Sequence, residues 1–121
     1  MARTLVVKCT VGVEENIERC AQAFTVATTA LAAGATVSLW LTGEATWLAV
    51  PGRAEAVELP HAAPFAELRD AVLAGGTLTV CTQCAARRDL SEDELMSGTR
   101  IAGSASFVDE VLAADAQALV Y

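Results

Sequence analysis

Positive charge is scarce in this chain of 121 residues, because eight Lys and Arg stand against fifteen Asp and Glu and leave a formal net charge of −7. Nucleic acids and anionic membrane surfaces are bound by clustered basic residues, so we expect neither as a partner. The chain also lacks an apolar run long enough to span a membrane. Its N-terminus enters a strand-like run without the apolar core and cleavage site of a signal peptide, which predicts a cytoplasmic protein.

The usual cofactor motifs are also missing. Neither a GxGxxG sequence nor a P-loop lysine motif occurs, so a nucleotide cofactor is not expected. The single CxxC leaves only Cys9, Cys20 and the one histidine, His61, as further metal ligands, in no recognisable spacing. We therefore predict no metal and no other cofactor. His61 lies in a proline-flanked connection, where the role of base and that of a solvent-facing residue both stay open.

Composition predicts one ordered domain over residues 1–121. Hydrophobic residues make up 54% of the chain and charged residues 19%, which excludes a disordered chain and favours a sheet buried on both faces. No linker, repeat or low-complexity tract divides the chain. The four cysteines are expected to be free thiols instead of a disulfide framework. The apolar excess also favours an oligomer interface.

Short β-rich runs alternate with helical patterns along the chain. Strands are predicted at residues 4–9, 35–41, 77–81, 99–102 and 116–120. Helices are predicted from Glu14 up to Gly34, over 44–50, 64–75, after the CxxC, at 91–94 and at 104–114. Strands alternating with helices require a mostly parallel sheet with helices on both sides, joined by right-handed crossovers.

The periodicity also predicts which side chains are buried. In the last helix four apolar residues are expected to face inward: Phe107, Val108, Val111 and Leu112. Cys20 lies on the apolar stripe of the first helix and is expected in the core. Trp40 and Trp47 are expected in the core or at a subunit contact. Residues 51–60 are expected to form an exposed connection.

Three strand ends are expected to meet at one edge of the sheet. The carboxyl ends of parallel strands carry the active groups in such folds, and here they would be Cys9-Thr10, Thr42-Gly43-Glu44 and residues 81–84. Cys9, Thr10, Gly43 and Glu44 are therefore candidate binding residues. For Cys9 a structural role is the alternative. For Glu44 the alternatives are an acid partner and a charge at a helix N-terminus.

The most informative segment is Cys81-Thr82-Gln83-Cys84, where an apolar strand stops and a helix begins. Cys84 would lie in the first turn of that helix, with Arg87 and Arg88 one turn on, and both features lower a thiol pKa. The alternative is a small buried hydrophobic residue. Cys81 ends the strand, where it would be either a resolving thiol or a packed strand residue. A thioredoxin fold is disfavoured, because its CxxC is faced by a downstream proline and all three prolines here lie upstream.

An ordered set of four segments resembles the DsrE/DsrF-like family over nearly the whole chain. The segments are ALAAG at 30–34, LTGE at 41–44, CTQCAARR at 81–88 and IAGSASFV at 101–108. The resemblance implies a three-layer α/β/α sandwich of the flavodoxin/Rossmann-like kind around a five-stranded parallel sheet. Family members usually assemble into trimers or hexamers, which implies a homo-oligomer for this chain.

The family also implies a function. Members with established roles are sulfur-relay proteins that carry a persulfide on one cysteine after a central strand, and by position that cysteine corresponds to Cys84. The partners would be sulfur donor and acceptor proteins, and the activity that of a sulfurtransferase or sulfur carrier. Two alternatives stay open: a thiol redox protein that uses Cys84 and Cys81, and a non-catalytic oligomeric module with a small ligand in an edge pocket.

Overall fold

Five strands form one sheet in the order β4-β3-β2-β1-β5, and all of its strand pairs are parallel. The structure is a computed structural model that describes residues 3–121. The strands are β1 Thr4–Cys9, β2 Thr36–Leu41, β3 Thr77–Cys81, β4 Arg100–Ala102 and β5 Ala116–Val120. The predicted α/β fold with a parallel five-stranded sheet is confirmed.

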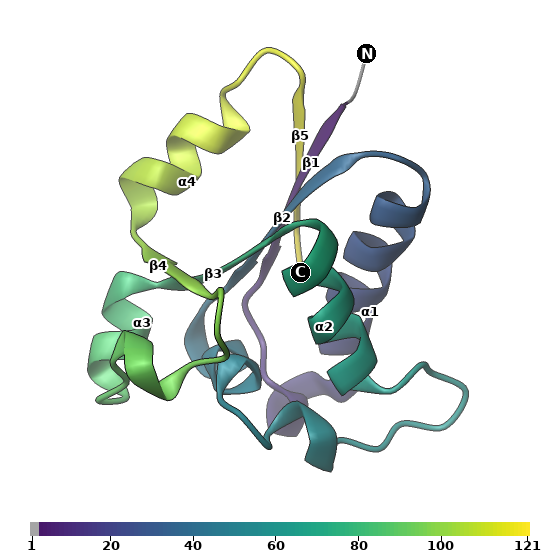
Figure 1. Cartoon of the computed structure of the whole chain (residues 1–121), viewed down its shortest axis with the longest axis vertical. Helices are drawn as coiled ribbons and strands as arrows, with labels where there is room; N and C mark the ends of the chain where they lie inside the picture. The colour runs from purple at the N-terminus through teal and green to yellow at the C-terminus, as the bar shows by residue number, and fades with distance from the viewer. Residues whose placement is uncertain (1–2) are drawn as a thin grey trace.

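The helices form the outer layers of a three-layer sandwich (Figure 1). They are α1 Val13–Ala32, α2 Phe65–Gly75, α3 Thr82–Arg87 and α4 Ser104–Val111, with 3₁₀ turns η1 Gly43–Ala49, η2 Ala54–Ala56 and η3 Glu92–Glu94. Helices α1 and α2 cover one face of the sheet, and α4 crosses the other (Figure 1). The chain steps from β1 to β4 in one direction and then returns to β5, so right-handed connections place the returning helix on the opposite face. Among residues 3–121, no helix combines the length and apolar character that crossing a membrane requires.

The face under α1 and α2 is covered by an apolar core. Alternate residues of the central strands point into it, among them Val7 and Leu39, which are both fully buried. Phe24 of α1 and Phe65 of α2 meet there with ring centroids 5.6 Å apart. Cys20 is fully buried in the same cluster, which confirms its predicted place in the core.

The start of α1 is bent. The Gly12 N–H donates to Oε1 of Glu15 at 2.8 Å and closes a first turn. Asn16 then leaves helical geometry with a φ of −160°, and its Oδ1 accepts the Arg19 N–H at 3.0 Å. Asn16 thus caps the regular helix, which begins at Ile17. The turn before it gives the loop after β1 a fixed shape.

The opposite face is held by polar contacts. Oε1 of Glu110 on α4 accepts the Ser38 hydroxyl at 2.5 Å and the Trp40 indole N–H at 3.0 Å. Its other oxygen pairs with Arg100 of β4. The Phe107 ring stands edge-on to Trp40, with centroids 5.3 Å apart. These directional contacts fix α4 on the sheet. Of the two places predicted for Trp40, the core and a subunit contact, it occupies the core, since it is 1% exposed.

The predicted burial of the last helix is wrong for two residues. Val108 is 45% exposed and Leu112, just beyond the end of α4, is 77% exposed. Phe107 and Val111 are half-buried, and among the described residues of α4 none is fully buried. The apolar residues do recur at helical spacing. However, within residues 3–121 α4 is a single helix on this face, and no further layer covers its outer side.

The connection over residues 51–60 is largely exposed, as predicted, yet it is anchored. Arg69 of α2 is 1% exposed and donates to both oxygens of Glu55 at 2.8 and 2.7 Å. These hydrogen bonds lower the pKa of Glu55 to about 2. Ala54 is buried beside them. The connection is therefore held against α2, which shapes the surface next to η1.

Candidate functional site

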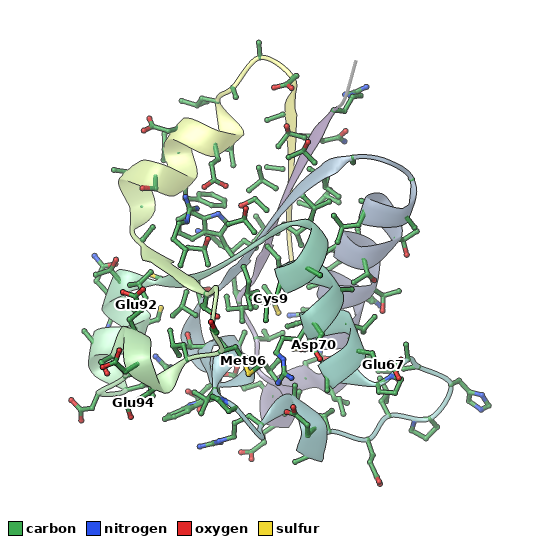
Figure 2. The ribbon with its side chains drawn as sticks, viewed as in Figure 1. Cys9, Glu67, Asp70, Glu92, Glu94 and Met96 are labelled. Carbon is green, nitrogen blue, oxygen red and sulfur yellow. The ribbon has the colours of Figure 1, made fainter. Side chains whose placement is uncertain are left out.

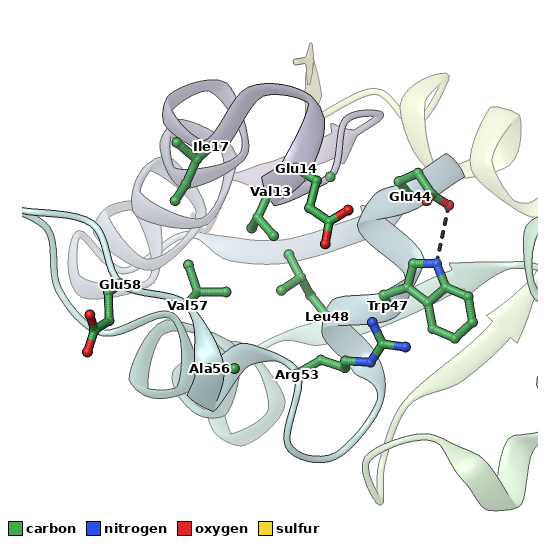
Figure 3. A pocket seen from close by; sticks show the side chains of 11 residues that line it. Val13, Glu14, Ile17, Glu44, Trp47, Leu48, Arg53, Ala56, Val57 and Glu58 are labelled. Carbon is green, nitrogen blue, oxygen red and sulfur yellow. Dashed lines mark hydrogen bonds between the residues drawn. The ribbon is translucent and has the colours of Figure 1, made fainter.

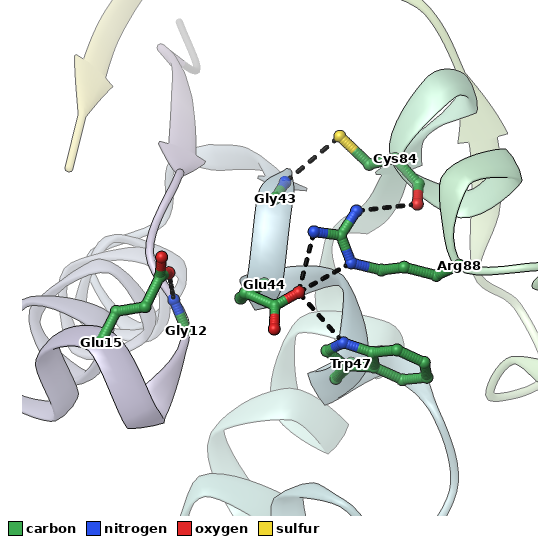
Figure 4. A network of polar contacts seen from close by, with 7 residues as sticks. All are labelled: Gly12, Glu15, Gly43, Glu44, Trp47, Cys84 and Arg88. Atoms are coloured by element: carbon green, nitrogen blue, oxygen red, sulfur yellow. Dashed lines mark hydrogen bonds and ion pairs between the residues drawn. The ribbon is translucent and has the colours of Figure 1, made fainter.

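The loops that follow β1, β2 and β3 meet at one edge of the sheet. The Thr42 N–H donates to the Cys9 carbonyl at 3.0 Å, which joins the first two loops. The Gly43 N–H donates to the Sγ of Cys84 at 3.2 Å, which joins the second loop to α3 (Figure 4). The structure therefore brings together the three strand ends that the sequence placed at a shared edge.

Arg88 connects this edge through its fork of donors (Figure 4). Its Nε and Nη2 reach Oε2 of Glu44 at 2.9 and 2.8 Å, and its Nη1 donates to the Cys84 carbonyl at 3.0 Å. The Trp47 indole N–H donates to the same Glu44 oxygen at 3.2 Å. The hydrogen bond from Arg88, assisted by Trp47, lowers the pKa of Glu44. Arg88 thus positions the backbone of Cys84 and holds Glu44 ionised.

Two glycines let the loops approach so closely. Gly43 has a φ of +55°, and a Cβ there would lie 3.2 Å from the Thr10 carbonyl oxygen. A Cβ on Gly12 would lie 2.7 Å from the Cβ of Glu44, closer than side chains allow. Any larger residue at either position would push the loops after β1 and β2 apart.

The two thiols of the CxxC have different surroundings. Cys84 is 7% exposed, with its sulfur turned toward Gly43. Cys81 is partly exposed and occupies the position before the first turn of α3. Its thiol donates to Oε1 of Gln83 at 3.4 Å. By the pleat of β3, Cys81 shares the α4 face of the sheet with Thr79, opposite the apolar core.

The surroundings of Cys81 favour its thiolate. Partial burial, the largest single influence, raises its pKa, but the backbone N–H and thiol of Cys84 and the backbone N–H of Gln83 act in the opposite direction. The charge of Lys8 on β1 adds to them, and together these groups lower the pKa of Cys81 below its ordinary value. A thiol with lowered pKa and some exposure is the form of cysteine that reacts with sulfur electrophiles.

Cys9 lies at the edge with its backbone only. Figure 2 shows Cys9 inside the molecule, where its side chain is fully buried. The Cys9 thiol donates to the Val11 carbonyl at 3.3 Å and lies 3.7 Å from the Sγ of Cys20. The contact with Cys20 lowers the pKa of Cys9 and raises that of Cys20. The two thiols are therefore hydrogen-bonded to each other inside the core, away from solvent.

The remaining predicted residues lie around the edge. The Thr10 hydroxyl donates to the Tyr121 carbonyl at 2.6 Å, which ties the loop after β1 to the end of β5. Arg87 is exposed and makes no ion pair within residues 3–121. His61 is exposed in the connection before α2, with a φ of +60°. Across the described part of the chain, no three His, Cys, Asp or Glu side chains gather as metal ligands.

Comparison with known proteins agrees with this arrangement. The model of the DsrE/DsrF-like family matches residues 10–117. The chain belongs to the DsrE/DsrF-like family. No curated protein matches its sequence.

Two solved structures share the fold of this DsrE/DsrF-like chain over the full length of both proteins. The crystal structure of the YchN protein from E. coli has a TM-score of 0.70 at 17% identity, covering 100% of each chain. The protein of unknown function MTH1491 from Methanobacterium thermoautotrophicum has a TM-score of 0.69 at 8% identity, again over 100% of each chain. At these identities the likeness establishes the fold alone.

Two residues of this DsrE/DsrF-like site are not predictable from the CxxC pattern. Lys8 places its ammonium 3.8 Å above the Phe107 ring and lowers the pKa of Cys81. The available signal was a lone lysine inside the apolar strand LVVKC. The role of Gly12 at the site gives no local signal, because its close approach to Glu44 depends on a neighbour 32 positions away in the sequence.

Proposed function

We propose that this chain is a sulfur carrier of the relay type that holds sulfane sulfur on Cys81. The observation that carries the proposal is the state of this thiol. It is partly exposed at the edge of the sheet where the loops after β1, β2 and β3 meet. Burial raises its pKa, but Cys84, Gln83 and Lys8 outweigh burial and lower that pKa. A persulfide anion on Cys81 would be stabilised by the same donors. Membership of a family that includes sulfur-relay proteins supports this chemistry.

The geometry favours Cys81 over Cys84, the cysteine to which the sequence resemblance assigned the sulfur. Cys84 is 7% exposed, and its sulfur already accepts the Gly43 N–H at 3.2 Å. A bulky persulfide donor reaches a partly exposed strand end more easily than a sulfur enclosed between two loops. In this proposal Cys84 helps to lower the pKa of Cys81, and Arg88 holds Cys84 in place through its carbonyl.

The transfer step requires only thiol chemistry. The Cys81 thiolate attacks the terminal sulfur of a donor persulfide, forming a new S–S bond while the donor's own S–S bond breaks. The electron pair of the broken bond leaves with the donor thiolate, so no oxidant or reductant is consumed. A thiolate on an acceptor protein then attacks the outer sulfur of Cys81 in the same way. The partners are therefore sulfur donor and acceptor proteins with reactive thiols.

Mass spectrometry after incubation with glutathione persulfide tests the proposal. We expect an adduct of about 32 Da on the peptide that holds Cys81, absent from Cys81→Ser and retained, at a lower rate, in Cys84→Ser. Cys20→Ser is the matched control, because its buried thiol lies outside the edge and the adduct should persist. An adduct on Cys84 that survives Cys81→Ser would overturn the assignment, and no adduct on any cysteine would overturn the function.

Thiol redox chemistry is the second candidate, favoured by the spacing of the two cysteines and by the influence of Cys84 on the pKa of Cys81. In that case a small disulfide would oxidise the pair to a Cys81–Cys84 disulfide with release of two thiols. Titration with oxidised and reduced glutathione separates the two functions. A defined potential for the pair, lost in either single serine variant and unaccompanied by persulfide uptake, would favour redox chemistry over sulfur transfer.

We also propose that the chain self-associates and is located in the cytoplasm. The outer side of α4 and the edge strand β5 expose Val108, Leu112 and Val120 at 45%, 77% and 62%. Exposed apolar side chains gain free energy when another protein covers them. A second copy of the chain suits this surface, in the trimers or hexamers that the family implies. Reduced cytoplasmic conditions would keep the Cys81 thiol free for transfer.

A further inference from the structure

A cavity of about 360 Å³ lies beside the edge of the sheet where Cys81 and Cys84 lie, and Glu44 forms part of its wall (Figure 3). Its walls come from the bent start of α1, the turn η1 and the anchored connection around η2. We call it the α1–η1 cavity. Its volume lies within the range of protein pockets that hold small organic molecules. The three segments that build it are each held by contacts described above, so the cavity is preformed.

One half of the α1–η1 cavity is apolar. Val13 and Ile17 from α1, Leu48 from η1 and Val57 after η2 form this part of the lining (Figure 3). Leu48 is buried in the core, whereas the other three are half-buried and face the cavity side of the core. A compact hydrocarbon or aromatic body would remove these surfaces from water, which is the main source of affinity in small pockets.

The other half is charged, and negative charge dominates. Glu14, Glu44 and Glu58 line the cavity together with a single cation, Arg53. The Arg53 guanidinium lies 4.5 Å from the centre of the Trp47 ring and is already engaged with its face. Figure 3 shows the Glu14 carboxylate directed into the space between α1 and η1.

Within residues 3–121 the carboxylate of Glu14 forms no ion pair, whereas Glu44 is paired with Arg88. Glu58 is exposed at the rim and likewise makes no ion pair among the described residues. The net charge of −7 on the whole chain further attracts cations and repels anions.

We propose that the α1–η1 cavity binds a small organic cation, a protonated amine or amidine carried on a compact apolar or aromatic body. The body packs on Val13, Ile17 and Leu48, and the cationic group pairs with Glu14. Binding in the cavity does not require sulfur chemistry, so the inference stands independently of the proposed function. The two sites are joined, because Glu44 lines the cavity and also holds Arg88, which positions Cys84.

Three probes of one shape and different charge test this proposal: benzamidine, benzamide and benzoate. In ¹H–¹⁵N NMR titrations of the full chain we expect saturable shifts for benzamidine at the backbone of Val13 and Ile17 and at the Trp47 indole N–H. Neutral benzamide should bind about three- to tenfold more weakly, and benzoate should leave these resonances unmoved. Benzoate binding as tightly as benzamidine, or no saturable shift with benzamidine, would overturn the proposal.

A pair of variants tests whether the Glu14 carboxylate binds the cationic group of benzamidine. Glu14→Gln removes the unpaired carboxylate from an exposed position and should weaken benzamidine binding about three- to tenfold. Glu92→Gln changes the net charge equally at an exposed position on η3, outside the cavity, and should leave the affinity unchanged. Equal weakening by both variants would show general charge attraction and reject the site. Persulfide uptake by Cys81 is measured separately, so failure of one proposal leaves the other standing.

Discussion

The two faces of the sheet are stabilised by different forces. Under α1 and α2 the strands bury Val7 and Leu39 against Phe24 and Phe65, in a core formed almost entirely of apolar side chains. Under α4 the contacts are directional, and they centre on the carboxylate of Glu110. Apolar burial scales with area and tolerates no gaps, whereas a polar clamp fixes orientation with little area. The first face therefore depends on close packing, and the second leaves Val108 and Leu112 exposed.

The cysteines also differ between the two faces of the sheet. Cys9 and Cys20 are fully buried in the apolar core, where no reagent reaches them in the folded state. Cys81 lies on the α4 side at the strand end, and Cys84 follows as a buried residue of α3. One residue type thus serves as a packing group on one face and as a candidate sulfur carrier on the other. The surroundings of a thiol, more than its presence in a motif, determine its chemistry.

The strongest test of the comparison is a large-to-small substitution in the apolar core. Phe24→Ala should lower the free energy of unfolding by about 3–5 kcal/mol, because it removes a fully buried ring and its contact with Phe65. Urea unfolding followed by circular dichroism measures the change. Phe107→Ala is the matched control on the α4 face, where the ring is half-buried, and it should cost clearly less. Equal costs would contradict the distinction between the faces.

A smaller effect is expected from breaking the polar clamp. Glu110→Gln should lower the free energy of unfolding at neutral pH by about 1–2 kcal/mol, moderated by the partial exposure of Arg100. Burial raises the pKa of Glu110, but hydrogen bonds from Ser38, Trp40 and Arg100 outweigh it and lower that pKa. The stabilisation is therefore complete above the pKa of an unfolded glutamate, about 4.3, and is lost as the pH falls through the lower folded value.

Urea unfolding of the wild type and of Glu110→Gln at several pH values tests the direction of this pH dependence. The difference in stability between the wild type and Glu110→Gln should be constant from about pH 7 to pH 5 and should narrow as the pH falls toward about 3. Glu92→Gln is the control, since its exposed carboxylate makes no ion pair within residues 3–121. A difference that widened with acidification would show that the Glu110 carboxylate does not stabilise the folded state.

The smallest effect on stability, and the sharpest on assembly, is expected at the exposed side of α4. Leu112→Gln should change the free energy of unfolding of a single chain by no more than about 0.5 kcal/mol, because Leu112 is 77% exposed. It should nevertheless weaken self-association, measured by light scattering coupled to size-exclusion chromatography. Ala113→Gln, at the next and also exposed position, is the control. A wild-type chain that stays monomeric at every concentration would remove the proposed role of this surface.

Much of the fold follows from local patterns. The positions of the five strands and of the main helices are those that periodicity and turn residues predict, because both signals depend on neighbours a few positions apart. The meeting of Cys9, Gly43 and Cys84 at one edge also follows, since parallel strands must end on the same side. The exposure of Val108 and Leu112 does not follow, because a periodic stripe gives no information on which layer covers it.

The site was less predictable than the fold. Two arginines follow the CxxC, yet the side-chain pattern does not reveal that Arg88 turns to Glu44 while Arg87 faces solvent. Residues 51–60 read as a simple connection, although the pairing of Glu55 with the buried Arg69 anchors them and shapes the neighbouring cavity. These contacts join residues far apart in the sequence, so their partners are defined only once the chain has folded.

The sequence by itself determined the parallel α/β class, the shared edge and the presence of two thiols there, because these depend on local periodicity and on the geometry common to all parallel sheets. Only the tertiary structure decided which thiol is reachable. Cys84 is enclosed by the loop that Gly43 brings against it, while Cys81 stays partly open beside Lys8, which comes from a different strand. Exposure and electrostatic surroundings are properties of the assembled chain, and they turned an expected carrier at Cys84 into a proposed carrier at Cys81.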